Sequence, residues 1–138
     1  MEIGNYVKTH SRVFIPQYTI IHDYVWLFPG VILTDDPHPP SEVRAGTTIK
    51  SFAARAAGVT ILPGLVIEQG CLIAAGSTLT KNTVPDTVWV GNPAKCAGPT
   101  STIRHKEKNI SAYPWQKHFY RGYPDEVVRS WNTDDRNC

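Results

Sequence analysis

The sequence predicts an all-β fold, a parallel β-helix built from hexapeptide repeats, and three observations lead to it. Aliphatic residues recur at every sixth position, small or uncharged residues follow four positions after most of them, and glycines lie close to these small residues. Neither a strand period of two nor a helix period of 3.6 gives a sixfold repeat. Three hexapeptides, about 18 residues, close one triangular coil, so each inward side chain stacks on its counterpart one coil later.

The repeat occupies two stretches of the chain. Its primary positions in the first stretch are Ile3, Thr9, Ile15, Ile21, Leu27 and Leu33, and those in the second are Ile49, Arg55, Ile61, Ile67, Ile73 and Leu79. Ten of these twelve positions hold Ile or Leu, although those two types make up 17 of the 138 residues, so the repeat is not a chance pattern. Arg55 is the charged exception. It lines an interface, ends an inward row or marks a coil out of register, and the sequence leaves these three readings open.

An insertion separates the two stretches. After Leu33 the next primary position would be residue 39, but the repeat resumes at Ile49, ten residues later. The inserted segment contains three prolines and paired aspartates, which do not continue a strand. We therefore predict an excursion loop over about residues 35–48. Loops that project from a rigid scaffold are where binding and catalytic residues concentrate.

These boundaries divide the chain into two parts. Residues 1–98 form the β-helix of about four to five coils, with coils at 3–20, 21–38, 49–66 and 67–84 and a last strand and turn at 88–95. Residues 99–138 form an aromatic-rich tail, in which a helix is expected after Pro124 because proline and acidic residues favour a helix start. We expect the tail to cap the bottom of the β-helix or to cover a neighbouring subunit.

Composition limits the classes of function. A net charge of +2 and a pI near 8.5 are too mild to indicate nucleic-acid binding. No segment approaches the roughly 20 apolar residues of a membrane span, and the first four residues do not resemble a secretory signal. Three cysteines without framework spacing indicate free thiols in a reducing cytoplasm. We expect a cytoplasmic protein that assembles as a homotrimer, because a triangular prism with small and apolar corners suits threefold packing.

The last coils carry a resemblance to a known family. The blocks AGSTLTK at residues 75–81 and GNPAK at residues 91–95 resemble the recurring ending of the hexapeptide-repeat acyltransferases, in particular the acetyl-CoA-dependent sugar acetyltransferases. The resemblance covers residues 3–98. It implies left-handed coils, a homotrimer, acetyl-CoA as acyl donor in a groove between neighbouring subunits, and a sugar or nucleotide-sugar acceptor near the excursion loop. It implies no metal.

The same resemblance assigns candidate catalytic residues. His38 is similar to the His-Pro histidine of galactoside and maltose acetyltransferases, which deprotonates the acceptor hydroxyl, and a neutral imidazole suits that role. Asp35 or Asp36 is placed to orient the imidazole. The segment also resembles the Thr-Asn-Asp-x-x-Pro loop of nucleotide-sugar N-acetyltransferases, with Asp35 in place of the asparagine, so hydroxyl and amine acceptors both remain open. His22 and, more weakly, His10 are further candidates.

Six residues are candidates for holding acetyl-CoA. Small residues on successive coils leave room for the thin pantetheine arm, and two lysines near the end of the β-helix suit the phosphates as point charges. These residues are Ala57, Gly58, Ala75, Gly76, Lys81 and Lys95.

Two other classes remain as alternatives. One is a non-catalytic structural or regulatory β-helix, against which the intact His-Pro loop argues. The other is a metalloenzyme of the γ-carbonic anhydrase type, which needs three histidines converging on a metal across a subunit interface. The spacing of His10, His22, His38, His105 and His118 does not match that pattern.

Overall fold

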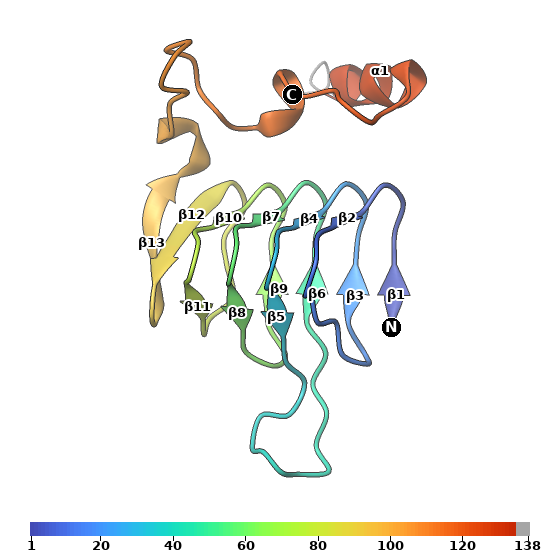
Figure 1. The fold of residues 1–138 in the computed structure, drawn as a ribbon, viewed down its shortest axis with the longest axis vertical. Coiled ribbons are helices and arrows are strands. Elements are labelled where there is room, and N and C mark those ends of the chain that lie inside the picture. Colours follow the sequence, from blue (N-terminus) through green and yellow to red (C-terminus); the bar gives the residue numbers. More distant parts are fainter. Residues whose placement is uncertain (135–138) are drawn as a thin grey trace.

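Short parallel strands wind along one axis and form three sheets in the computed structural model, which describes residues 1–134 and the side chains of residues 1–131 (Figure 1). Sheet A has the order β1 (Glu2–Ile3), β3 (Ile20–Ile21), β6 (Thr48–Ile49), β9 (Val66–Ile67). Sheet B has the order β13 (Ala94–Pro99), β12 (Thr87–Gly91), β10 (Leu72–Ile73), β7 (Ala54–Arg55), β4 (Trp26–Leu27), β2 (Lys8–Thr9). Sheet C has the order β11 (Thr78–Leu79), β8 (Thr60–Ile61), β5 (Ile32–Leu33).

The strand register confirms the predicted hexapeptide repeat. In sheet A, Ile3 pairs with Ile21, Ile21 with Ile49, and Ile49 with Ile67. In sheet C, Ile61 pairs with Leu79. Each pair joins residues one coil apart, and the pairing of Ile21 with Ile49 shows that the ten inserted residues leave the repeat in phase. The β-helix predicted from the spacing is therefore the observed architecture.

The inward columns form the core of the β-helix. Nearly all the primary residues from Ile21 onward are fully buried, as are the corner residues Val25, Val31 and Val59. Ile3, in the first coil of the described chain, is 50% exposed. Each buried aliphatic side chain contributes roughly 1.5–3 kcal/mol, and the contributions accumulate coil by coil.

The corner between sheets A and B is built from aromatic residues. Tyr6, Tyr24 and Phe52 occupy equivalent places in successive coils, all with positive φ, at 55°, 62° and 64°. A left-handed conformation costs a bulky residue roughly 1–3 kcal/mol. The three rings stack with centroid separations of 5.8 Å and 5.0 Å, which offsets part of that cost. We call these three residues the aromatic ladder.

The excursion loop leaves the β-helix between β5 and β6 and projects well beyond the coils (Figure 1). Its base is closed by a hydrogen bond from the Ala45 amide to the Asp35 carbonyl, at 2.8 Å. The chain returns through Gly46, where a β-carbon would lie 1.8 Å from the Tyr18 carbonyl oxygen. A residue larger than glycine does not fit there without moving the backbone. The loop therefore has a defined exit and a defined return.

The tail lies along the flank of the β-helix, over sheet B and the aromatic ladder, and not across its end (Figure 1). It contains the short helices η1 (Thr100–Thr102) and η2 (Trp115–Lys117) and the helix α1 (Asp125–Asp134), which begins directly after Pro124 as predicted. The Trp115 indole donates to the Phe52 carbonyl at 3.1 Å, and the Trp26 indole donates to the Tyr123 hydroxyl at 2.9 Å. Residues 135–138 of the predicted tail lie outside the described residues. Over the part of the chain that is described, no helix has the length and apolar character of a membrane span.

Arg55 points into the core. Its pairing with Leu27 on one side and Ile73 on the other keeps the coil in register, and its side chain is fully buried. Among the described residues, none accepts a hydrogen bond from its Nε, Nη1 or Nη2 atoms. Burial away from water lowers the pKa of Arg55 to about 9, with a smaller opposing effect from Cys71. The sequence therefore places one uncompensated cation inside an aliphatic column.

Replacing Arg55 by Met is expected to raise the melting temperature, because a buried charge without a partner costs more than an apolar side chain of similar length. The pH dependence gives an independent check. Above about pH 9 the folded state has released the Arg55 proton while the unfolded state still binds it, so wild-type stability rises with pH relative to Arg55→Met. Thermal unfolding followed by circular dichroism from pH 7.5 to 10.5 measures both effects. A lower melting temperature for Arg55→Met at all pH values would show that the guanidinium has a partner.

Candidate functional site

His38 lies near the tip of the excursion loop, with its side chain exposed. Its backbone amide donates a hydrogen bond to Oδ1 of Asp36 at 3.0 Å. This hydrogen bond anchors the His38 backbone on the loop, and the side chain is exposed to solvent. An exposed ring on an anchored loop is available to a molecule that approaches from outside, including a neighbouring subunit.

Asp36 organises the loop around His38. Its carboxylate accepts hydrogen bonds from the Ser41 hydroxyl at 2.6 Å and the Ser41 amide at 2.8 Å, and Nη1 of Arg44 lies 3.4 Å from it. The Ser41 hydroxyl bond is the largest cause of the lowered pKa of Asp36. Asp35 faces Nε of Arg44 at 3.7 Å. Within this chain, both carboxylates therefore hold loop atoms and Arg44, and the hydrogen bond that Asp36 accepts from His38 comes from its backbone.

The other two candidate histidines lie on different sheets. His22 follows β3 and projects from sheet A, where the equivalent residues of the next two coils, Lys50 and Glu68, form an ion pair at 3.2 Å. His10 follows β2 on sheet B, and its ring stacks on Phe28 with a centroid separation of 4.8 Å. In a single chain, the fold does not bring His10, His22 and His38 together.

The small residues predicted to accommodate the pantetheine arm form an exposed ladder at the corner between sheets B and C. Ala57 and Gly58 lie on one coil, and Ala75 and Gly76 lie at the same places one coil later. The Gly58 amide donates to the Pro29 carbonyl and the Gly76 amide to the Ala57 carbonyl, each at 2.9 Å, so these two amides are used between coils. The ladder offers a narrow, uncharged strip of surface.

The two candidate lysines lie at the end of the β-helix remote from the N-terminus. Lys81 follows β11, and Lys95 belongs to β13, in the hairpin that closes the helix (Figure 1). Both side chains are exposed, and neither is paired with a carboxylate among the residues that the structure describes. Lys95 lies in sheet B and Lys81 follows sheet C, so the two ammonium groups share the last coil of the β-helix but lie on different faces of it.

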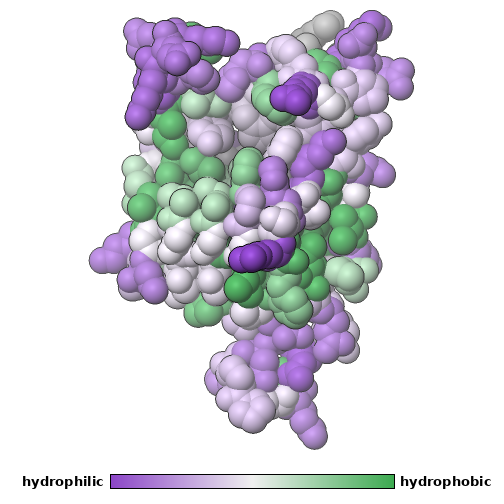
Figure 2. Space-filling view, viewed as in Figure 1, coloured by the Kyte–Doolittle hydropathy of each residue, from purple (hydrophilic) through white to green (hydrophobic). Residues whose placement is uncertain are grey.

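Sheet C lies between the excursion loop and the small-residue ladder. The loop leaves at the corner between sheets C and A, and the ladder occupies the corner between sheets B and C. The outward residues of sheet C carry no charge: they are Phe14, Ile32, Thr60, Thr78 and, just beyond β8, Leu62. Phe14 and Ile32 are 57% and 43% exposed. Figure 2 shows hydrophobic residues gathered over the coils, between a hydrophilic loop and a hydrophilic tail.

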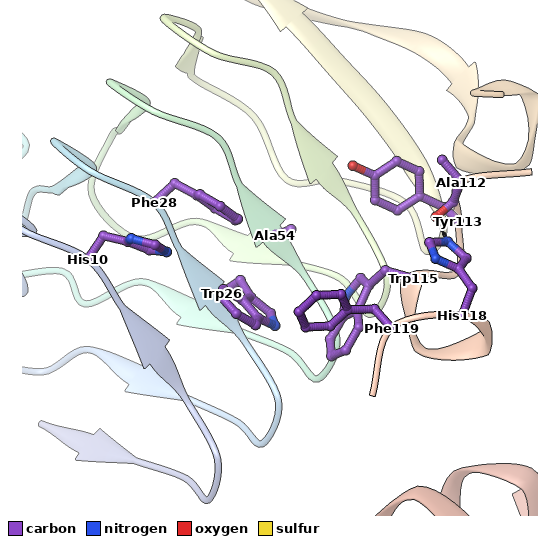
Figure 3. Close-up of a pocket in the computed structure, with 9 residues that line it drawn as sticks. All are labelled: His10, Trp26, Phe28, Ala54, Ala112, Tyr113, Trp115, His118 and Phe119. Carbon is purple, nitrogen blue, oxygen red and sulfur yellow. Dashed lines mark hydrogen bonds between the residues drawn. The ribbon is translucent and has the colours of Figure 1, made fainter. Parts of the chain in front are cut away.

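A cavity of about 350 Å³ lies between sheet B and the tail (Figure 3). The β-helix lines it with His10, Trp26, Phe28 and Ala54, and the tail adds several aromatic residues. This cavity was not predicted from the sequence. The recurrence of aromatic residues at equivalent coil positions was a signal for it, because such residues need a second apolar surface to cover them.

No group of three His, Cys, Asp or Glu side chains that is able to hold a metal occurs in the described part of this chain. The two cysteines described as free, Cys71 and Cys96, are buried and exposed respectively. Cys71 fills a corner position of the repeat, as its place in the sequence predicts, and its Sγ lies 2.9 Å from the Val84 carbonyl.

No family model matches the chain, but individual proteins do. It is 44% identical to the mitochondrial gamma carbonic anhydrase 2 of Arabidopsis thaliana over 57 residues, which is 40% of this chain and 20% of that protein. It is 33% identical to serine acetyltransferase 4 of the same organism over 107 residues, or 69% of this chain and 28% of the relative. The chain thus spans less than a third of the length of these two relatives.

Solved structures extend the likeness to about 70% of the chain. A maltose O-acetyltransferase from Clostridium difficile 630 superposes with a TM-score of 0.66 and 27% identity, covering 70% of this chain and 57% of that one. A serine acetyltransferase from Brucella abortus strain S19, solved in complex with coenzyme A, shares the fold with a TM-score of 0.64 and 24% identity, covering 71% of this chain and 39% of that one. The chain therefore resembles the hexapeptide-repeat acetyltransferases, as its sequence predicts.

Proposed function

We propose that this protein transfers an acetyl group from acetyl-CoA to a hydroxyl or amine of a sugar or nucleotide-sugar, at a site between the subunits of a homotrimer of left-handed β-helices. The observation that carries the proposal is the anchored excursion loop. It presents an exposed His38 at one edge of an uncharged sheet whose other edge is a strip of small residues. A base and a donor groove are the two parts that acetyl transfer needs.

The loop supplies the base. A hydroxyl is a weak nucleophile, and a neutral imidazole accepts its proton as the oxygen attacks the acetyl carbonyl, after which the CoA sulfur leaves. Asp36, Ser41 and Arg44 contribute by fixing the loop backbone on which His38 is mounted. An amine acceptor requires less help from a base, and for such an acceptor the role of Asp35 is to bind the sugar.

The ladder and the lysines supply the donor site. Ala57, Gly58, Ala75 and Gly76 leave space for a thin, flexible arm along the corner, and Lys81 and Lys95 present charge for phosphates beyond it. In one chain this strip and His38 lie on opposite sides of sheet C. Packing the sheet C face of one subunit against a neighbour brings the strip of one chain toward the loop of the other, so the site is shared. His22 is a further candidate in that shared site.

The three faces of the prism differ in their suitability for contact between subunits. The tail covers much of sheet B, and sheet A carries Glu2, the Lys50–Glu68 ion pair and His22. Sheet C is uncharged and exposes Phe14, Ile32 and Leu62. Exposed apolar patches of this kind mark protein interfaces, so the trimer contact is assigned to sheet C.

Ile32→Glu is expected to convert the trimer into monomers, because a carboxylate would be buried in the proposed contact without a partner. Ile20→Glu on sheet A is the matched control, since Ile20 is also an outward-facing isoleucine, 38% exposed, and is expected to leave the trimer intact. Sedimentation velocity gives the assembly state of both variants. Dissociation by Ile20→Glu alone would assign the contact to sheet A, and a monomeric wild-type protein would contradict the shared site.

Replacing Lys81 and Lys95 together by Ala is expected to weaken acetyl-CoA binding and to reduce the salt dependence of the affinity, since two phosphate contacts are lost. Lys50→Ala is the control, because this lysine lies on sheet A and is paired with Glu68. Calorimetric titration at two salt concentrations measures the change. Equal affinities for the double variant and the wild type would show that other groups hold the phosphates.

His38→Asn is expected to lower turnover on a hydroxyl sugar by roughly 10²–10⁴-fold and to leave acetyl-CoA binding unchanged, because only the base is removed. For an amine acceptor, His38→Asn costs little and Asp35→Ala weakens substrate binding. Thioester cleavage with a panel of sugars measures both variants. Wild-type turnover by His38→Asn on a hydroxyl acceptor would end the general-base role, and His22 would be tested next.

Two competing functions rank below acetyl transfer. The likeness to a gamma carbonic anhydrase supports a metal-dependent hydration activity, which needs three convergent metal ligands. Such a site is shared between subunits, so the spacing of the histidines along the sequence is the relevant observation, and His10, His22, His38, His105 and His118 do not have the spacing of that type. A non-catalytic β-helix would not require the anchored His38 loop.

A further inference from the structure

The cavity between sheet B and the tail lies on the flank of the β-helix opposite the excursion loop. The cavity of about 350 Å³ between sheet B and the tail is within the range of small-molecule sites, roughly 300–1,000 Å³. The loop projects from the other side of the coils (Figure 1), and His38 does not line the cavity. The proposed acetyl-transfer site therefore does not account for it.

The floor of the cavity is a gap in a column of large side chains. Trp26, Ala54 and Leu72 are paired in register on successive strands of sheet B, so Ala54 interrupts a bulky row for one coil. In the neighbouring column Phe28 stacks on His10, and the next two coils have Ala56 and Ala74 at the same place, so the bulky row ends at Phe28. Strands in a sheet lie about 4.8 Å apart, which is close to a stacking distance between rings. The space over Ala54, between Trp26 and Leu72, is therefore wide enough for one aromatic ring to stack in it.

The opposite wall comes from the tail. Trp115 and Phe119 meet Trp26 edge to face, with centroid separations of 6.3 Å and 5.8 Å. The indole N–H groups of Trp26 and Trp115 donate to Tyr123 and to the Phe52 carbonyl, so both rings offer carbon surface to the cavity. An aromatic occupant continues the stack of Phe28 and is covered by the edges of the tail rings.

One hydroxyl gives the cavity a polar handle. Figure 3 shows the Tyr113 ring with its hydroxyl turned toward the β-helix side of the cavity. Burial raises the pKa of Tyr113, so the hydroxyl keeps its proton at neutral pH and is able to donate. The lining contains no carboxylate, ammonium or guanidinium group, only the imidazoles of His10 and His118. A charged ligand would find no counter-charge among these residues.

We propose that this cavity binds a small, uncharged, planar aromatic molecule that stacks on Phe28 over Ala54 and accepts a hydrogen bond from Tyr113. The site is separate from acetyl transfer and does not depend on it. Because one wall is the β-helix and the other is the tail, an occupant bridges the two parts of the chain.

The test uses 2-naphthol as the probe and its saturated analogue, decahydro-2-naphthol, as the comparison. Calorimetric titration of the full chain is expected to give saturable binding of one 2-naphthol per chain. The preference over the saturated alcohol is expected to be roughly 3–10-fold, as ring stacking provides. In proton–nitrogen spectra, the indole signals of Trp26 and Trp115 are expected to shift, while that of Trp89, which donates to Thr87, stays in place.

Ala54→Leu fills the gap with the residue found one coil later and is expected to lower the affinity for 2-naphthol at least about tenfold without loss of thermal stability. Thr48→Leu, at the matching outward position of sheet A, is the control and is expected to bind like the wild type. Tyr113→Phe is expected to weaken 2-naphthol binding several-fold and to leave naphthalene binding unchanged, because only the hydrogen bond is lost. This variant tests the proposal even if Ala54→Leu does not fold. Absence of 2-naphthol binding by the wild type, equal binding by Ala54→Leu, or equal binding of the saturated alcohol would overturn the proposal.

Discussion

Hydrogen bonding between equivalent residues of successive coils is the constraint on which the rest of this structure depends. Each two-residue strand is paired in register with the strand of a neighbouring coil, so the position of a residue in the repeat determines the sheet it lies in and whether its side chain points inward or outward. The inward columns, the corners and the outward rows all follow from that pairing. Arg55 shows how strong this constraint is, because the strand pairing is kept even though it places a cation among aliphatic side chains.

Much of the fold was predictable because the sixfold repeat is a direct consequence of this pairing. The primary residues, the excursion loop and the start of α1 were found from the sequence alone. The position of the tail was not, since it is determined by contacts between Trp115 or Tyr123 and aromatic residues far away in the chain. Periodicity reports which residues share a face, but it carries no information on what covers that face.

The candidate site was predictable in part, because the repeat determines on which surface a residue lies but not which side chains it contacts. The sequence singled out His38, the small residues and the two lysines, and the fold places them on accessible surfaces. The expectation that Asp35 or Asp36 orients the His38 imidazole is not met within this chain, because these carboxylates contact Ser41, Arg44 and the His38 backbone amide. Their role in shaping the loop depends on side-chain geometry that spacing alone does not determine.

The ten-residue excursion has a consequence for how such proteins diversify. Its exit and return are fixed by two hydrogen bonds, from the Ala45 amide to the Asp35 carbonyl and from the Gly64 amide to the Ala45 carbonyl, and by the close packing of Gly46 against the Tyr18 backbone. The coils resume in phase after it. Neither the stacked core nor the strand register depends on the residues between these anchor points. The segment is therefore an exchangeable module: recombination can replace it with a loop of another length and chemistry while the inherited scaffold stays unchanged. New surface chemistry at this edge of the β-helix can then arise without any change in the coils.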